Sequence, residues 1–127
     1  AINSVLRQTY KNWELIIVDD RSTDSSEKLI SEYINNDERI RYIKNTHKQG
    51  PAGARNQGIE KSRGEYIAFL DSDDEWKEWH LKEIMEEFEI NEDLDWIYAD
   101  IEREEGGRLR TISKFKEEWK GKDKFKI

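Results

Sequence analysis

Two acidic clusters each follow an apolar run in this chain of 127 residues. The first is Asp19-Asp20, directly after LIIV, and the second begins with Asp71-Ser72-Asp73, directly after YIAFL. Carboxylates are hard oxygen ligands that suit Mg²⁺ or Mn²⁺. They also accept hydrogen bonds from a base imide or a ribose hydroxyl. Both clusters are therefore candidates for binding a phosphate-bearing molecule and its metal ion.

The spacing of Asp71 and Asp73 lets both carboxylates converge on one metal ion, because residues i and i+2 of an extended segment point to the same side. Two such ligands leave coordination positions open for water and phosphate oxygens. The structural alternative is that Ser72, Asp73 or Asp74 caps the following helix and interacts with its dipole. Spacing alone leaves both interpretations open.

Asp19 and Asp20 have a similar pair of interpretations. A carboxylate at the carboxyl end of a strand can bind a base or a ribose. Alternatively, the aspartate side chains accept hydrogen bonds from backbone N–H groups of an Asx-type turn in the segment that follows them.

The glycine-rich segment 50–58, GPAGARNQG, leads into a predicted helix. Glycine permits close approach of the backbone to a bound molecule, and a helix N-terminus favours anions. Arg55 within this segment could stack on a base or pair with a phosphate. It could equally form a structural ion pair with one of the acidic clusters.

Apolar runs and their periodicity predict the elements that must position these residues. The strands are expected at 15–18, 40–43, 66–70 and 96–101, with a hairpin turn at 105–108 leading into 109–112. The helices are expected up to about 34, at 54–62 and at 78–90. Alternating strands and helices imply a mostly parallel sheet, in which molecules bind beyond the carboxyl ends of the strands. Both acidic clusters fall at such ends.

Composition narrows the class of protein. The net charge of −7 argues against nucleic acid as a partner. Absence of cysteine excludes a disulfide framework and fits a cytoplasmic compartment. The longest apolar run is too short to span a bilayer, and no signal peptide is visible. Residues 1–112 are expected to form one folded domain, and 113–127 a lysine-rich segment that is either a docked helix or a tail.

Three runs, in this order, resemble family 2 glycosyltransferases over residues 1–100: SVLRQTYKNWELIIVDDRSTDSS, RIRYIKN and GPAGARNQGIEKSRGEYIAFLDSDDEW. The resemblance implies the α/β GT-A fold of nucleotide-diphospho-sugar transferases, a Rossmann-like three-layer α/β/α sandwich. It also implies that residues 1–112 form a partial nucleotide-sugar-binding domain of this fold. It also implies a metal-dependent enzyme that transfers a sugar from a nucleoside diphosphate, in the first place UDP, with inversion. The acceptor stays open among a glycan, a lipid and a small molecule.

Position in the family's motifs implies a role for each candidate residue. Asp20 corresponds to the residue that contacts a uracil-type base, with Asp19 beside it. Arg55 lies in the loop that the family places near the nucleotide. Asp71 and Asp73 match the DxD motif, with Asp71 near the ribose and Asp73 ligating the Mn²⁺ or Mg²⁺ that bridges the diphosphate.

The chain departs from the family's pattern in two respects. The family starts with a strand before the helix at Ile2, Val5 and Leu6, so we expect a vacant sheet edge that a second copy could cover in a homodimer. No residue matches the family's general base, and Asp100 has no family motif around it. Attachment to the inner face of the membrane would need a partner or a missing segment.

Two other classes of function stay open as alternatives. The chain could be a folded, non-catalytic fragment that binds nucleotide weakly or not at all. A phospho-acceptor receiver domain would share LIIVDD, but it also needs a lysine after a late strand, and no such strand is found here.

Overall fold

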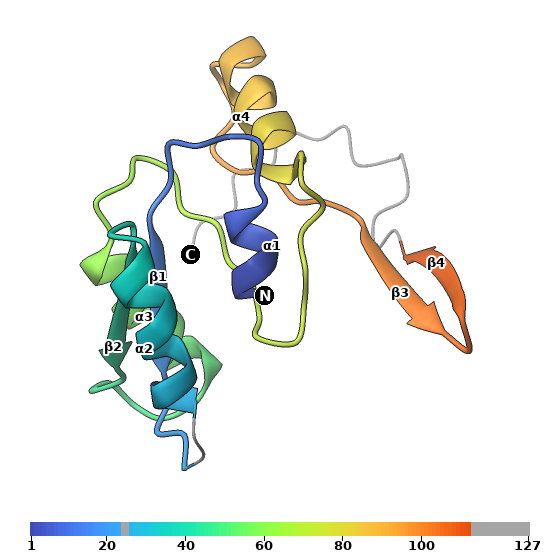
Figure 1. Ribbon diagram of the computed structural model, residues 1–127. Helices are drawn as coiled ribbons and strands as arrows, with labels where there is room; N and C mark the ends of the chain where they lie inside the picture. Colours follow the sequence, from blue (N-terminus) through green and yellow to red (C-terminus); the bar gives the residue numbers. More distant parts are fainter. Residues whose placement is uncertain (24–25, 113–127) are drawn as a thin grey trace. The chain divides into compact units, whose positions relative to one another are not determined.

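The computed structural model describes residues 1–23 and 26–112. The chain divides into two compact units, Ala1–Ile90 and Asn91–Ile127. Among the described residues, the first unit contains a two-stranded parallel sheet and four helices, and the second contains a β-hairpin (Figure 1). None of the helices in the described residues is long and apolar enough to cross a membrane.

Strands β1 (Leu15–Asp19) and β2 (Ile40–Lys44) pair in parallel, joined by helix α2 (Ser26–Asn36). The register pairs Leu15 with Ile40 and Asp19 with Lys44, which confirms the predicted parallel pairing. Both strands therefore end at the same edge of the sheet. Their β-branched runs suit a pleated surface with helices over it. The residues of β1 are partly buried rather than fully buried.

Helices pack against both strands of this sheet. α2 packs against β2, while α3 (Pro51–Lys61) packs against β1. In Figure 1, α2 lies in front of the strands and α3 behind them. α3 begins three residues earlier than predicted because Pro51 occupies its first turn, where a fixed φ and a missing N–H are tolerated. Gly50 before it has a φ of 119°, which only glycine adopts readily.

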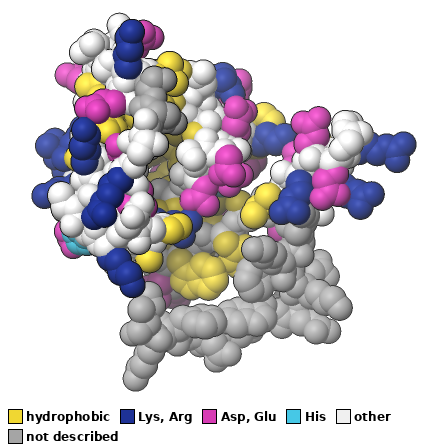
Figure 2. All heavy atoms as spheres, turned by 90° about the horizontal axis from the view of Figure 1, so that it is seen from below, with side chains coloured by type: hydrophobic (Ala, Val, Ile, Leu, Met, Phe, Trp, Pro, Cys, Tyr) yellow, Lys and Arg dark blue, Asp and Glu magenta, His cyan; other side chains and the backbone are white. Residues whose placement is uncertain are grey.

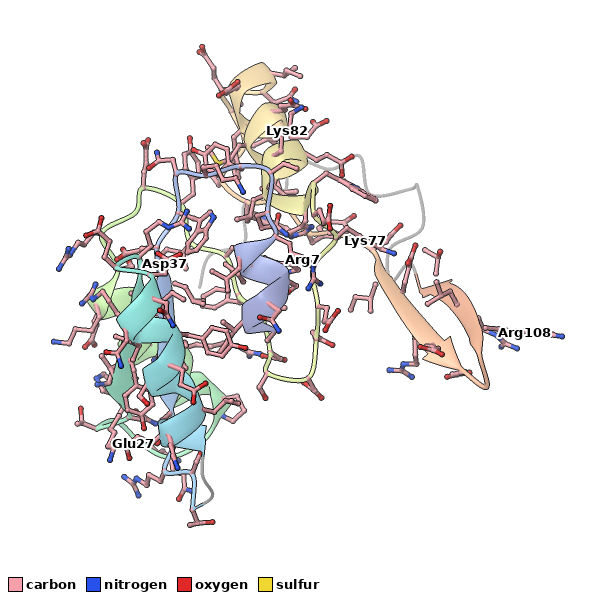
Figure 3. All side chains as sticks on the ribbon, viewed as in Figure 1. Arg7, Glu27, Asp37, Lys77, Lys82 and Arg108 are labelled. Carbon is pink, nitrogen blue, oxygen red and sulfur yellow. The ribbon has the colours of Figure 1, made fainter. Side chains whose placement is uncertain are left out.

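The remaining helices of the first unit are α1 (Ile2–Leu6) and α4 (His80–Ile90). α4 confirms the helix predicted at 78–90, and its apolar residues Leu81, Ile84, Met85 and Phe88 are less exposed than its glutamates. Gln8 is fully buried and connects the segment after α1 to the start of α4. Its side-chain amide donates a hydrogen bond to the Lys77 carbonyl at 2.7 Å and accepts one from the Leu81 N–H at 2.9 Å. Figure 3 shows Arg7 and Lys77 at this junction.

The predicted strand at 66–70 is wrong. The backbone there forms no strand, and the exposed fractions of Tyr66, Ile67 and Phe69 are 46%, 45% and 52%. A segment becomes a strand only when a neighbour pairs with its backbone N–H and C=O groups. Within the described residues, the parallel sheet contains only β1 and β2, so the apolar sequence of this segment finds no partner strand.

The hairpin of the second unit consists of β3 (Ile101–Glu105) and β4 (Arg108–Ile112), paired antiparallel. Gly106 and Gly107 form its turn with φ values of 60° and 75°. Positive φ at both central residues is the geometry of a tight hairpin turn, as the Gly-Gly pair predicts. The strand predicted at 96–101 is wrong over most of its length, because β3 begins only at Ile101, where antiparallel pairing with β4 starts.

Candidate functional site

Asp20, the first residue after β1, is tied to the loop that follows β2. Its Oδ1 accepts a hydrogen bond from Asn45 Nδ2 at 2.6 Å, and its Oδ2 accepts one from the Gly50 N–H at 2.7 Å. The carboxylate therefore joins the carboxyl edge of the sheet to the start of α3. A carboxylate oxygen has more than one acceptor direction, so each oxygen can still accept a further hydrogen bond.

Two buried amides, neither of them among the residues expected from the sequence, organise the loop between β2 and α3. Asn45 is 5% exposed, and its Oδ1 accepts a hydrogen bond from the His47 N–H at 2.9 Å. Gln57 is also 5% exposed, and it accepts from the Thr46 N–H at 2.6 Å while donating to the Lys44 carbonyl. A feature of the sequence that points to Asn45 is its position directly after the second parallel strand, where side chains of a ligand site are expected.

Asp19 has the structural role that the turn interpretation describes. Its Oδ1 accepts a hydrogen bond from the Ser22 N–H at 2.8 Å, and its Oδ2 accepts one from the Tyr42 hydroxyl at 2.6 Å. Hydrogen bonds from Ser22 and then Tyr42 lower the pKa of Asp19, while the bond to the Asp19 carboxylate raises the pKa of Tyr42 to about 12. Asp19 is thus held ionised and fixed at the end of β1.

Arg55 of α3 forms an ion pair with Asp71, with its guanidinium nitrogen 2.8 Å from Asp71 Oδ1. The guanidinium carbon lies 6.0 Å from the centroid of the Phe69 ring. The two charged side chains are 46% and 58% exposed, so water screens the pair and its contribution to stability is small. The structure thus contains the ion pair that the structural interpretation of Arg55 expects, and this pair also brings Arg55 and Asp71 together.

The first half of α3 is the element that connects these residues. Asp20 bonds to Gly50, immediately before the helix, and Asp71 pairs with Arg55 within it. Pro51 and Arg55 are separated by about 6 Å along the helix axis at the usual rise per residue. One aspartate from each acidic cluster is therefore anchored to the same end of one helix.

Gly53 lets the loop and the helix come this close. A Cβ atom built on Gly53 would overlap the backbone carbonyl of Lys48, whereas one built on Gly58 would lie 3.5 Å from Val18 Cγ2. The first position accepts only glycine without movement of the loop, and the second is an ordinary van der Waals contact.

Asp73 is exposed, and within the described residues no hydrogen bond or ion pair engages its carboxylate. The Asp74 N–H donates to the Asp71 carbonyl, so Asp71 to Asp74 form a turn ahead of α4. In the described part of the chain, no group of three or more His, Asp or Glu side chains could hold a metal ion by itself. Any ion bound here would take most of its ligands from water and phosphate.

The ring of Trp76, four residues before α4, stacks on that of His80, the first residue of α4, at a centroid distance of 4.9 Å. Burial lowers the pKa of His80, which favours the neutral imidazole at physiological pH. Arg7 lies 3.8 Å from carboxylate oxygens of both Glu75 and Glu78 in the same region. These contacts hold the segment after the acidic turn against α1.

A parallel α/β unit with polar side chains clustered beyond the carboxyl ends of its strands is typical of nucleotide-binding domains. Residues 1–126 match the model of Glycosyl transferase family 2, and the chain belongs to this family of transferase enzymes. The membership confirms the resemblance found in the sequence and, with the parallel sheet and its helices, the GT-A α/β fold class.

Curated relatives carry glycosyltransferase names. The Bacillus subtilis protein TuaG, whose name proposes a teichuronic acid biosynthesis glycosyltransferase, is 45% identical over 86 residues, which are 68% of this chain and 34% of the relative. Escherichia coli WfgD, a UDP-Glc:alpha-D-GlcNAc-diphosphoundecaprenol beta-1,3-glucosyltransferase, is 47% identical over 76 residues, covering 60% of this chain and 29% of the relative.

A third relative, from Campylobacter jejuni, is named GalNAc(5)-diNAcBac-PP-undecaprenol beta-1,3-glucosyltransferase. It is 34% identical over 110 residues, which are 86% of this chain and 35% of the relative. The chain thus spans about a third of the length of the curated relatives that it matches.

Proposed function

We propose that this chain forms the donor-binding part of a glycosyltransferase that moves a sugar from a nucleoside diphosphate, with UDP as the preferred nucleotide. The observation that carries the proposal is the attachment of Asp20 and Asp71 to the same end of α3, through Gly50 and Arg55. Side chains from two acidic clusters, far apart in the sequence, would then face one nucleotide.

Each residue has a distinct task in this proposal. Asp20, held by Asn45 and Gly50, offers its remaining lone pairs to the imide N–H of the base. Arg55 pairs with Asp71 in the free protein, and Asp71 accepts a hydrogen bond from the ribose when the nucleotide binds. Arg55 stays exposed enough to swing from Asp71 to a phosphate oxygen, which a planar guanidinium binds well.

The carboxylate oxygens of Asp71 and Asp73 are ligands that fit a hard divalent cation, Mn²⁺ or Mg²⁺. Asp73 would hold it, because its carboxylate is exposed and no described side chain engages it, and Asp71 lies two residues earlier in the chain. When bound, such an ion offsets negative charge on the departing nucleoside diphosphate. Asp73 would thereby fix the diphosphate relative to the base held at Asp20. Inversion would follow if an acceptor hydroxyl, losing its proton to a base, forms its bond to the anomeric carbon on the face opposite to the departing nucleoside diphosphate.

A lipid-linked acceptor is part of the proposal. Two of the relatives are named as glucosyltransferases acting on diphosphoundecaprenol-linked sugars, and UDP-Glc stands in one of these names. We extend this acceptor class to the whole protein, together with a cytoplasmic location at the membrane surface where lipid diphosphates are found.

Calorimetric titration of UDP with and without Mn²⁺ tests the donor site. Wild type should bind UDP more tightly with Mn²⁺, and Asp73→Asn should weaken Mn²⁺-dependent binding by about tenfold or more. The matched control is Asp74→Asn, which removes the same charge one residue away and should change the affinity by less than about twofold.

Three results separate the hypotheses. Equal Mn²⁺ dependence in wild type and Asp73→Asn would remove Asp73 from the metal site. Loss of UDP binding in Asp20→Asn, with an unchanged circular dichroism spectrum, supports the base contact. Formation of a glycosylated lipid from a UDP-sugar distinguishes an active transferase from a folded fragment that binds nucleotide and transfers nothing.

A further inference from the structure

The two faces of the β3–β4 hairpin carry opposite charges. Directly opposed residues of an antiparallel pair share a face, and side chains alternate along each strand. The register therefore gives one face three arginines and one glutamate beside an exposed isoleucine, and we call it the basic face: Ile101, Arg103, Glu105, Arg108 and Arg110. The other face has glutamates as its charged residues: Glu102, Glu104, Leu109 and Thr111. The hairpin thus segregates its charges by face.

The basic face is open to solvent. The side chains of Arg103 and Glu105 are 64% and 54% exposed. Figure 2 shows Lys or Arg atoms and Asp or Glu atoms crowded on the hairpin at the right, and in Figure 3 Arg108 projects outward from the hairpin.

Arg103 lies directly opposite Arg110 in the ladder. Like charges placed opposite each other weaken a strand pair. The one carboxylate of the basic face, Glu105, lies 3.8 Å from Arg103 and offsets only part of this repulsion. An anion held between the arginines would relieve it, and the guanidinium fork matches the oxygens of a phosphate.

Charge is also unevenly distributed along the whole sequence. Residues 101–127 contain nine Lys and Arg against six Asp and Glu, whereas residues 1–100 contain 13 against 23. A basic end on an acidic protein is typical of a contact with a charged surface. The sequence after β4 also interleaves its lysines with Phe115, Trp119 and Phe125, a composition that suits the headgroup region of a bilayer.

We propose that the basic face docks the protein on phosphate headgroups of an anionic lipid bilayer. The proposal rests on the lipid-linked acceptor proposed above, because docking would bring the transferase to the surface where that acceptor lies. The guanidinium groups of the basic face would also bind phosphates of nucleic acid, so displacement by nucleic acid is one outcome of the test below.

Co-sedimentation of the full chain with vesicles tests this proposal. One set of vesicles contains phosphatidylcholine alone, and the other contains phosphatidylcholine and phosphatidylglycerol in equal parts. Wild type should bind the anionic vesicles and not the neutral ones. The double variant Arg103→Gln/Arg110→Gln should lower the partition coefficient on the order of tenfold, from two lost arginines near the surface.

The matched control Lys28→Gln/Lys82→Gln removes the same charge from exposed positions of α2 and α4. Its partition coefficient should change by less than about twofold if the contact is confined to the hairpin. Equal losses in both variants, or equal binding to neutral and anionic vesicles, would overturn the proposal. Displacement from the vesicles by a short single-stranded oligonucleotide would also overturn it, in favour of nucleic acid.

UDP titration of the same proteins keeps the two proposals separate. The hairpin variants should bind UDP as wild type does, because the donor site lies in the first unit. If wild type fails to bind UDP but still requires anionic lipid for sedimentation, the donor site is refuted while membrane docking stands. Far-ultraviolet circular dichroism of each variant checks that the loss of vesicle binding is not a loss of folding.

Discussion

Replacement of Asn45 by alanine should destabilise the first unit through loss of a buried polar network. The side chain is 5% exposed, donates to Asp20 Oδ1 at 2.6 Å and accepts from the His47 N–H at 2.9 Å. A hydrogen bond to a charged group contributes about 1.5–3 kcal/mol and a neutral one about 1 kcal/mol. Since Asp20 is only partly buried, water will replace part of the loss, and we expect about 2–3 kcal/mol.

Urea unfolding followed by far-ultraviolet circular dichroism measures this change. With a typical urea dependence for a domain of this size, the unfolding midpoint should fall by roughly 1–2 M. The control Asn36→Ala removes an exposed amide that donates to the Glu32 carbonyl within α2. Its free energy of unfolding should change by less than about 0.5 kcal/mol.

Asn45→Asp sharpens the test, because it keeps the shape of the side chain and replaces the donor with a carboxylate facing Asp20. Two ionised carboxylates at hydrogen-bonding distance repel each other, so at pH 7 this variant should be less stable than Asn45→Ala. The difference should shrink as the pH falls through about 4, where carboxyl groups become protonated. A free energy of unfolding within about 0.5 kcal/mol of wild type for Asn45→Ala would refute the reasoning.

Two further predictions concern the same edge of the sheet. Gly53→Ala should lower the free energy of unfolding by about 2 kcal/mol or more, because the added Cβ overlaps the Lys48 carbonyl. Gly58→Ala in the same helix should raise it by about 0.5–1 kcal/mol. Urea titrations in which both variants change stability in the same direction would contradict the close approach at Gly53. Tyr42→Phe should cost about 1–2 kcal/mol at pH 7, since it removes the 2.6 Å bond to Asp19. The pKa of Asp19 is lowered in the folded state, so this cost is present above the unfolded value of 3.8 and disappears as the pH falls below it. A cost that is constant from pH 7 to about pH 3 would argue against the hydrogen bond.

Local pattern in the sequence was sufficient for the elements whose partners are close along the chain. Apolar runs at 15–18 and 40–43 predict β1 and β2, and their parallel pairing follows from the single helix between them. Gly106-Gly107 predicts the hairpin turn, because only glycine adopts positive φ at both positions without strain. The order of motifs along the chain was enough to identify the family.

Tertiary contacts decided what local pattern could not. The segment 66–70 has the composition of a strand, but strand formation depends on a neighbouring backbone, which composition does not reveal. Arg55 had several acidic side chains as candidate partners, and the position of α3 on the sheet selected Asp71. Asn45 looks like an ordinary loop residue until the fold buries it beside Asp20. Burial and long-range partners are properties of the packed chain, because they arise from residues that lie far apart in sequence.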